Sequence, residues 1–437
     1  MWLLPTLSRL SRLAAHGFYR LTLTGNTVPA EGPVLLVANH PNSLVDPLFV
    51  ACAAGRPVRF LAKAPLFDHP TVGFLVRGSG AIPVHRRKDD PGRMEQNEDT
   101  FRAAYDALAR GSAVALFPEG MSHSEPSLQP LKTGAARIAL GAREAGGPPF
   151  PIIPIGIVLR ARETFRSEAL IIVGQPIEWE DLGRLGVEDR KAVHQLTDRI
   201  DEALRGVTLN LERWEDEPLV STAEAVWAAE ADASLKETDR MARLDRTATL
   251  LAAVRAGGDE QWRSLTRRLL GYRRKLSLLN LSPATLDSDV SLHAAAQWSW
   301  NRLPLFAAVG LAVLGSVIFW APYRLIRFID RLLGLDRDAR ATRKLLGGVT
   351  IMVGWILLLA VLGAAQGGVG VGLALVLGLP LLGLGTQWLR DWWGDSWREA
   401  RRYLLLRYQP ALRAALRAEQ TALAQELERI NREFPSL

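Results

Sequence analysis

Residues 34–50, VLLVANHPNSLVDPLFV, form an apolar run that is interrupted at His40 and resumes after Asp46. The segment 34–38 predicts a buried strand, and Asp46 followed by Pro47 predicts an N-cap and the first residue of a helix. His40 and Asp46 therefore flank a short loop at the carboxyl end of a strand, which is the edge where open α/β sheets place their sites.

A histidine and a carboxylate on one loop can form a general-base dyad. The loop can fold the Asp46 carboxylate onto one ring nitrogen of His40, which fixes the tautomer and leaves the other nitrogen free to accept a proton from a substrate hydroxyl. A single histidine beside a strand is more often structural, so the pair by itself leaves both interpretations open.

The rest of the N-terminal half alternates short apolar runs with helix-like stretches. The runs lie at residues 34–38, 58–62, 81–84, 113–117, 152–158 and 170–173, and the helix-like stretches at 95–110 and 132–145. This alternation is typical of an α/β domain, and we predict one over residues 21–215. Residues 216–303 lose the strand-like runs and become rich in Arg, Glu, Ala and Leu, which predicts a helical region.

The clearest membrane signal is the uncharged stretch 345–389, interrupted near its middle by Gln366-Gly367-Gly368. Two helices of about 20 residues match the hydrocarbon thickness of a bilayer, and the glycines permit a tight reversal, so we predict a C-terminal transmembrane helical hairpin. The apolar segment 304–322 is shorter and begins and ends near prolines. We expect it to be re-entrant or interfacial, or else transmembrane, with the first alternative favoured.

Basic residues precede and follow the predicted hairpin. Arg324 and Lys344 are among those before it, and Arg390 and Arg402 are among those after it. The positive-inside rule then places both ends of the hairpin in the cytoplasm. We therefore expect a membrane protein, located in a bacterial inner membrane, with its α/β domain on the cytoplasmic face.

Both ends of the chain carry amphipathic patterns. Residues 1–20 have a basic face opposite an apolar one, formed by Arg9, Arg12, His16 and Arg20 against Leu3, Leu7, Leu10 and Leu13. Such a helix either lies on an anionic membrane surface or packs against the α/β domain. In residues 390–437, apolar side chains recur at spacings of three, four and seven, which predicts a cytoplasmic amphipathic helix. We favour a solvated helix over one that dimerises.

The net charge and the numbers of cysteines and histidines limit the kinds of binding partner and stabilising site that the chain can have. The formal net charge of +7 favours an anionic partner, which is nucleic acid, a phospholipid surface or a phosphorylated substrate. No motif supports nucleic-acid binding. The single cysteine, Cys52, excludes a disulfide framework and predicts a small buried apolar residue. The seven histidines are scattered without an HExxH pattern, so we expect no metal site.

Three further blocks follow the opening stretch in order: GAIPVHRR (80–87), LFPEGMSHSEPSLQPLKTGAARIAL (116–140) and PIIPIGI (151–157). With the Asn-His-Pro segment, they resemble the four ordered motifs of the glycerolipid acyltransferases. The resemblance implies a mixed sheet flanked by helices. It also implies transfer of a fatty acyl group to a hydroxyl of glycerol 3-phosphate, dihydroxyacetone phosphate or 1-acylglycerol 3-phosphate in phospholipid biosynthesis.

By this resemblance His40 is the base and Asp46 is the residue that orients it. The acceptor oxygen then attacks an acyl thioester directly, with coenzyme A or acyl carrier protein as co-substrate and no other cofactor. The absence of a Gly-x-Ser-x-Gly segment from the sequence agrees with a reaction that has no enzyme nucleophile. Two rival functions remain, a catalytically silent lipid-binding scaffold and a transacylase that takes its acyl group from a phospholipid.

The resemblance also implies roles in substrate binding. Arg86 is expected to hold the phosphate of the acceptor, because a guanidinium fork matches phosphate geometry. Glu119 and Gly120 are expected to shape the acceptor site, with backbone N–H groups near Gly120 directed at the phosphate or the oxyanion. Pro154 is expected to line the acyl-binding region, or else simply to begin a strand.

Two features depart from the family pattern. Five residues separate His40 from Asp46, where most of the family has four, and on a continuous helix the extra residue would rotate the carboxylate by about 100°. The longer spacing resembles the branch with eukaryotic glycerol-3-phosphate and dihydroxyacetone-phosphate acyltransferases. Met121-Ser122-His123 stands where the family has Thr-Arg-Ser, so the usual arginine is missing. Lys132 or His123 could supply the missing donor, although Lys132 is equally compatible with an ordinary surface lysine.

Overall fold

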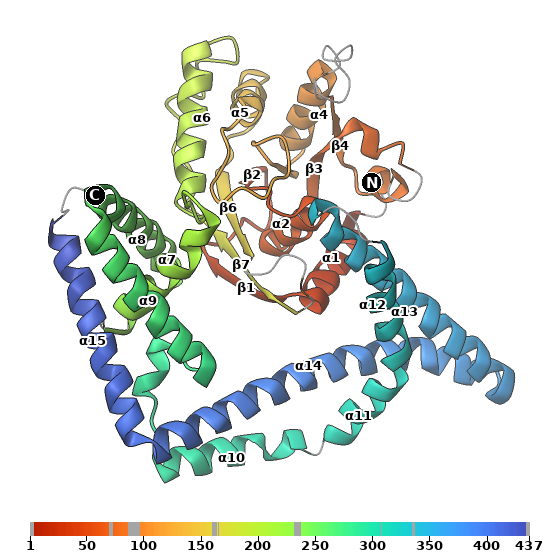
Figure 1. Ribbon diagram of the computed structural model, residues 1–437. Helices are drawn as coiled ribbons and strands as arrows, with labels where there is room; N and C mark the ends of the chain where they lie inside the picture. The colour runs from red at the N-terminus through yellow and green to blue at the C-terminus, as the bar shows by residue number, and fades with distance from the viewer. Residues whose placement is uncertain are drawn as a thin grey trace. The chain divides into compact units, whose positions relative to one another are not determined.

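The computed structural model describes residues 4–69, 73–85, 97–159, 164, 166–230, 237–306, 308–333 and 337–433. These residues form two compact units. The first is built mainly from residues up to Glu212 and contains the sheet, and the second is built mainly from residue 213 onwards and is helical (Figure 1). The division lies close to residue 215, where the α/β domain is predicted to end.

A mixed sheet forms the centre of the first unit. Its seven strands are β1 (Arg20–Gly25), β2 (Val34–Ala38), β3 (Val58–Lys63), β4 (Ile82–Val84), β5 (Ala113–Leu116), β6 (Ile152–Leu159) and β7 (Glu168–Val173). They are arranged in the order β1-β7-β6-β2-β5-β3-β4, and β6 and β7 are the one antiparallel pair in this sheet. The predicted α/β fold with a mixed sheet is confirmed.

Helices flank this sheet. They are α1 (Leu4–Phe18), α2 (Asp46–Ala54), α3 (Gly73–Gly78), α4 (Asn97–Ala109), α5 (Gly134–Glu144) and α6 (Arg190–Arg205). Six of the strands and helices α4 and α5 lie where the sequence predicts them. The prediction missed β1, because this strand lies at the edge of the sheet and exposes apolar residues such as Leu23, which is 50% exposed.

The position of β2 in the sheet explains why the candidate site lies in residues 34–50. All five residues of β2 are buried, and the strand lies between β5 and β6. Val37 pairs with Leu116 of β5 on one side and with Pro154 of β6 on the other, both in parallel register. Because parallel strands end at the same edge of a sheet, the residues that follow β2 and β5 emerge next to each other.

Helix α1 packs on the α/β unit. It contacts α2, and Ala15 and Phe18 are buried there. Leu13 is 55% exposed, and the side chains before Ser11 lie outside the described residues. The packing alternative for residues 1–20 is therefore observed, and contact of the same helix with a membrane stays a prediction.

Cys52 lies in α2 and is buried, as its sequence context predicts. Burial raises the pKa of its thiol to about 11, and the nearby Arg12 partly opposes this shift. A buried thiol with a raised pKa holds little thiolate at neutral pH, so Cys52 is a structural residue.

The second unit consists of helices in the part of the chain that the structure describes. They are α7 (Glu217–Glu230), α8 (Glu237–Gly257), α9 (Asp259–Leu279), α10 (Leu292–Phe306), α11 (Val309–Ile318), α12 (Trp320–Leu333), α13 (Arg337–Gly367), α14 (Val369–Tyr408) and α15 (Pro410–Glu433). The first six residues of α8 and of α13 group with the first unit. Helices occupy the predicted helical region, whereas the helix predicted over residues 390–437 is divided, because α14 continues to Tyr408 and α15 begins at Pro410.

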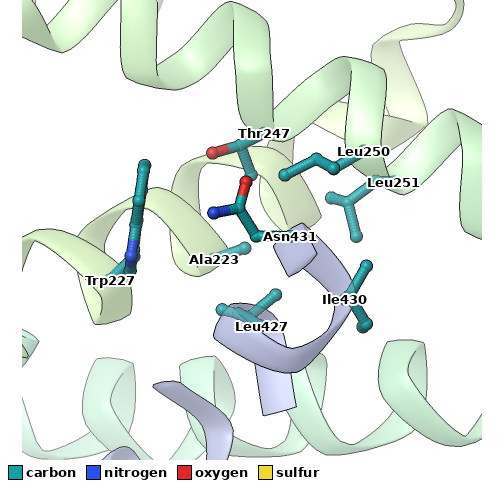
Figure 2. Close-up of a pocket in the computed structure, with 8 residues that line it drawn as sticks. All are labelled: Ala223, Trp227, Thr247, Leu250, Leu251, Leu427, Ile430 and Asn431. Carbon is teal, nitrogen blue, oxygen red and sulfur yellow. The ribbon is translucent and has the colours of Figure 1, made fainter. Parts of the chain in front are cut away.

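The C-terminal helix α15 is not a solvated tail, so that prediction is wrong. Leu416, Leu423 and Ile430 are at most 3% exposed, and Figure 2 shows Leu427, Ile430 and Asn431 directed toward side chains of α7 and α8. The amide of Gln420 is buried with them, accepting a hydrogen bond from Tyr272 and donating one to Glu230. Because the apolar face of α15 is used inside the chain, nothing supports self-association through it.

Replacing Leu423 by alanine is expected to destabilise this helical bundle by about 2–5 kcal/mol, because it leaves a cavity at a fully buried position. The measurement is the thermal unfolding midpoint of the full-length protein in detergent. Leu278→Ala is the matched control, because Leu278 is 69% exposed on α9. Equal midpoints for the two variants would contradict the packing described for α15.

Two helical segments are long and apolar enough to cross a membrane, residues 347–367 of α13 and helix α14. The chain reverses between them at Gly368, whose φ of 84° favours glycine. Gly372 lies close to α13, where an added Cβ would be 2.9 Å from the carbonyl oxygen of Ala360. Such small residues let membrane helices approach closely. The fold therefore contains two adjacent apolar helices where the hairpin is predicted, and their length and composition suit association with a membrane.

The shorter apolar segment is bent. Helix α11 and the start of α12 together form an apolar pair with a bend of 52° between them. A bend of this size is compatible with a broken span and with a re-entrant segment, so both alternatives for residues 304–322 stay predictions.

Candidate active site

The loop after β2 brings His40 and Asp46 together. The Nδ1 atom of His40 lies 2.7 Å from Oδ2 of Asp46, and the Asp46 side chain is fully buried while that of His40 is 18% exposed. Phe117 stacks on the imidazole, with ring centroids 4.0 Å apart and planes 12° apart. The Nε2 atom of His40 has no partner within the described part of the chain, so it is the nitrogen available to a substrate.

A tight turn accommodates the five-residue spacing. A 3-10 helix at Ser43–Val45 precedes α2, and Ser43 adopts a φ of 51°, which residues other than glycine rarely do. The turn directs Asp46 back to the backbone N–H of Asn42, which donates to the same Oδ2 over 2.7 Å. Asp46 is the first residue of α2, and the N-cap position before it is taken by Val45. The expected N-cap role is therefore wrong, and the carboxylate orients His40 instead.

Asn39 anchors the loop to the sheet. Its side-chain oxygen accepts from the backbone N–H of Ile157 over 2.7 Å, and its side-chain nitrogen donates to the carbonyl of Ile157 over 3.0 Å. This pair of bonds to β6 fixes the residue that immediately precedes His40. Sequence reasoning did not assign this role to Asn39, although its position at the end of β2 next to the histidine could have indicated it.

Glu119 joins the two loops that follow β2 and β5. Its Oε1 accepts from the backbone N–H of His40 over 2.8 Å, and its Oε2 accepts from the backbone N–H of Gln129 over 2.9 Å. Its side chain is fully buried, so Glu119 is not a surface carboxylate. The carboxylate holds the backbone of the candidate base in place, which fits a role in shaping the site.

His123 is engaged within the site. Its Nε2 is bonded to Oε2 of Glu119, and its Nδ1 accepts from the backbone N–H of Glu125 over 3.2 Å. Because Nδ1 accepts, the proton is on Nε2, which then donates to Glu119. With both nitrogens used in this way, His123 is a poor replacement for the arginine that the third motif lacks.

Gly120 and Lys132 lie against each other. Gly120 has a φ of 73°, and an added Cβ would lie 3.0 Å from the Cδ, Cε and Nζ atoms of Lys132. The Lys132 side chain is exposed and has no ion-pair partner within the described residues, so its ammonium is available to an anion. Of the two donors that the sequence offered in place of the missing arginine, Lys132 fits better.

The backbone N–H of Gly120 is not available to a ligand, because it donates to the carbonyl of Phe117 over 3.0 Å. The next two N–H groups, of Met121 and Ser122, have no acceptor within the described residues. The hydroxyl of Ser122 accepts from both the N–H and the hydroxyl of Ser43, which ties this turn to the loop after β2. The expected backbone donors are therefore at residues 121 and 122.

The geometry of the site leaves two of the predicted roles untested, those of Arg86 and Pro154. Arg86 lies outside the described residues, so its phosphate-binding role stays a prediction. Pro154 is the third residue of β6, and its Cγ atom would be 2.7 Å from a Cβ added at Gly174. It is a buried residue within the strand and does not begin it, and its role in acyl binding stays a prediction.

Tyr19 lies behind the dyad and was missed by sequence reasoning. Its hydroxyl accepts from the side chain of Asn42 over 3.0 Å. Burial raises the pKa of Tyr19 well above its usual range, the bond from Asn42 lowers it, and the charge of Asp46 raises it. Tyr19 is therefore a neutral support for the loop. Among the described residues, no group of three or more His, Cys, Asp or Glu side chains is arranged to hold a metal ion.

Comparison with known proteins agrees with this geometry. The family model described as Acyltransferase matches residues 20–158, which include β1 to β5, all but the last residue of β6, and the two loops of the site. The domain is therefore an acyltransferase domain. Relatives that align with this domain are glycerolipid acyltransferases by name, so residues 20–158 belong with the acyltransferase domains of that family.

Two relatives are from Saccharomyces cerevisiae. Glycerol-3-phosphate O-acyltransferase 2 is 38% identical over 120 residues, covering 26% of this chain and 16% of the relative. Glycerol-3-phosphate O-acyltransferase 1 is 25% identical over 379 residues, covering 66% of this chain and 49% of the relative. The matches thus span at most about half the length of these yeast proteins. Among solved structures, a 1-acyl-sn-glycerophosphate acyltransferase from Thermotoga maritima matches with a TM-score of 0.35 and 20% identity, covering 47% of this chain and 78% of that one.

Proposed function

We propose that this protein transfers a fatty acyl group from a thioester donor to a hydroxyl of a glycerol-phosphate acceptor at the membrane. The observation that carries the proposal is the His40–Asp46 pair, in which the buried carboxylate holds Nδ1 and Nε2 remains available. Such an imidazole can accept a proton from an alcohol, and the described site contains no other histidine with an unoccupied ring nitrogen next to a buried carboxylate.

The reaction has two steps, addition of the acceptor oxygen to the thioester carbonyl and collapse of the tetrahedral intermediate that results. The acceptor hydroxyl gives its proton to Nε2 of His40 as its oxygen attacks the thioester carbonyl, and Asp46 stabilises the imidazolium that forms. The N–H groups of Met121 and Ser122 are the proposed donors to the oxyanion. Collapse expels the thiolate, which takes the proton back from His40, so the products are the ester and the free thiol.

Glycerol 3-phosphate is the acceptor that we place first. Both yeast relatives are glycerol-3-phosphate acyltransferases by name, and the alignment with one of them covers 66% of this chain, well beyond the matched domain of residues 20–158. The similarity therefore includes residues outside the acyltransferase domain. Dihydroxyacetone phosphate and 1-acylglycerol 3-phosphate present the same phosphate to Lys132 and are the alternatives.

The test is acyl transfer by the purified full-length protein in detergent. Palmitoyl-CoA and palmitoyl-acyl carrier protein are each supplied with glycerol 3-phosphate, dihydroxyacetone phosphate or 1-acylglycerol 3-phosphate, and the products are identified by mass. A reaction that occurs only when phospholipid replaces the thioester would favour the transacylase. No transfer under any of these conditions would favour the lipid-binding scaffold.

Replacing Lys132 by methionine is expected to lower kcat/KM for the phosphorylated acceptor about tenfold or more, because the site loses a charge-assisted bond to phosphate. The loss is expected mainly in KM. Lys191→Met, a change of another exposed lysine in the same unit, is the matched control. An equal loss with a phosphate-free acceptor such as 1-acylglycerol would contradict the role in phosphate binding.

The finer location is also a proposal. We propose that the acyltransferase domain lies on the cytoplasmic face of a bacterial inner membrane, because basic residues flank the apolar hairpin on both sides. Labelling of single cysteines introduced near Arg324 and Arg402, in a Cys52→Ala background, tests this topology. Accessibility of either site from outside the cytoplasm would contradict it.

A further inference from the structure

The second unit contains a groove of about 750 Å³ between α11 and α14, which we call the α11 groove. It is lined along α11 and the start of α12 by Val309, Val313, Val317 and Trp320, and from α14 by Arg390 and Trp393. Its volume is within the range of about 300–1,000 Å³ that is typical of pockets for small-molecule ligands.

One face of α11 forms the apolar wall of this groove. The lining residues of α11 are Val309, Ala312, Val313, Ser316 and Val317, which recur at spacings of three and four and so form one stripe along the helix, apolar except for Ser316. The helix itself is held firmly, because Gly315 lies against Thr386 of α14 and the indole nitrogen of Trp355 donates to the carbonyl of Ile318. Val313 and Val317 are nevertheless 57% and 69% exposed. The groove is thus a fixed apolar surface that is open on one side.

Arg390 places one positive charge at the end of this surface. It is the only charged residue among those that line the groove, it is exposed, and it has no ion-pair partner in the part of the chain that the structure describes. It is also the first charged residue after the uncharged stretch 345–389. A cation at the end of a membrane-spanning apolar segment lies at the depth of the lipid headgroups.

Aromatic residues mark the same depth. Trp393 is 45% exposed at the groove, and Trp388 and Trp397 are 57% and 68% exposed along the same helix as Arg390. Tryptophan concentrates at membrane–water interfaces because its ring is apolar and its N–H is polar. The groove therefore extends from an interfacial cation along an apolar wall, which is the distribution of polarity in a phospholipid.

We propose that the α11 groove binds an anionic phospholipid, with its phosphate on Arg390 and one acyl chain along Val309, Val313 and Val317. A guanidinium fork suits a phosphate, and the apolar stripe suits a hydrocarbon chain. The α11 groove shares no residue with the candidate active site around His40. The proposal therefore does not depend on acyl transfer.

The test uses full-length protein in detergent, titrated with 1-palmitoyl-2-oleoyl-phosphatidylglycerol or with the diacylglycerol that has the same chains, and measured by native mass spectrometry. We expect one phosphatidylglycerol to be retained more tightly than the diacylglycerol. Arg390→Gln is expected to weaken phosphatidylglycerol binding about tenfold or more and to leave diacylglycerol binding unchanged. Arg401→Gln, which removes another exposed arginine from the same helix, is the control for general charge.

A second pair of variants tests the apolar wall. Val313→Trp fills the groove and is expected to weaken the binding of both lipids, whereas Val361→Trp, at a 67% exposed position on α13, is expected to weaken neither. Equal effects of Arg390→Gln and Arg401→Gln, or no effect of Val313→Trp, would overturn the proposal. A change from oligomer to monomer on Val313→Trp would also overturn it, because a second copy of the chain would then occupy the groove.

Discussion

Replacing His40 by alanine is expected to lower kcat for acyl transfer by about 10²–10⁴-fold, because the reaction loses the group that removes the proton from the acceptor hydroxyl. The KM for the acceptor is expected to change little, since the imidazole acts on the reacting oxygen while Lys132 is the proposed contact to the phosphate. The measurement is product formation from palmitoyl-CoA and glycerol 3-phosphate, with unfolding followed in parallel to show that the variant is folded.

His194→Ala is the matched control for this variant, because His194 is an exposed histidine on α6 in the same unit. It is expected to retain full activity. A folded His40→Ala protein with undiminished kcat would exclude His40 as the base. The proposed reaction would then need another proton acceptor, and the described site offers none in an equivalent position.

Replacing Asp46 by asparagine is expected to lower kcat by about 10²–10⁴-fold as well, for a different reason. The neutral amide no longer stabilises the imidazolium, and its NH₂ group can donate to Nδ1 and so place the proton on Nε2, the nitrogen that must accept one. Kinetic measurement of kcat and KM separates this effect from a loss of binding, which would raise KM instead.

Asp198→Asn, at an exposed position of α6, controls for the removal of a carboxylate. Because Asp46 also accepts from the N–H of Asn42, some loss of stability is expected, and activity is compared below the unfolding temperature of each variant. If Asp46→Asn retained the kcat of the unchanged protein, Asp46 would be a structural residue of the loop only.

The sequence predicted the central sheet and the dyad because both depend on local patterns. The buried run 34–38 is apolar throughout, and a histidine directly after it has to emerge at the edge of the sheet. The conformation that joins His40 to Asp46 was beyond prediction, because a serine with a positive φ has no sequence signal. Which of two donors replaces the missing arginine was also undecidable from sequence, since the partners of His123 depend on contacts made in the folded chain.

The error at α15 has a similar physical origin. Apolar residues spaced by three, four and seven specify that a helix has an apolar face, and they do not specify what covers that face. In this chain the apolar face of α15 packs against α7, α8 and α9, which precede α15 by more than a hundred residues. The hairpin was easier to predict, because an uncharged stretch of that length needs only the bilayer to explain it.

The shared carboxylate of Glu119 has a consequence for engineering this protein. It accepts from the backbone of His40 and from the ring of His123, and the backbone N–H of His123 in turn donates to the carbonyl of His40. The segments 39–46 and 117–129 are thus linked by hydrogen bonds, and the conformation of each depends on the other although they are far apart in the chain. Grafting Thr-Arg-Ser from a relative in place of residues 121–123 would disturb the base as well as the acceptor site. A working chimera would have to exchange both segments as one cassette.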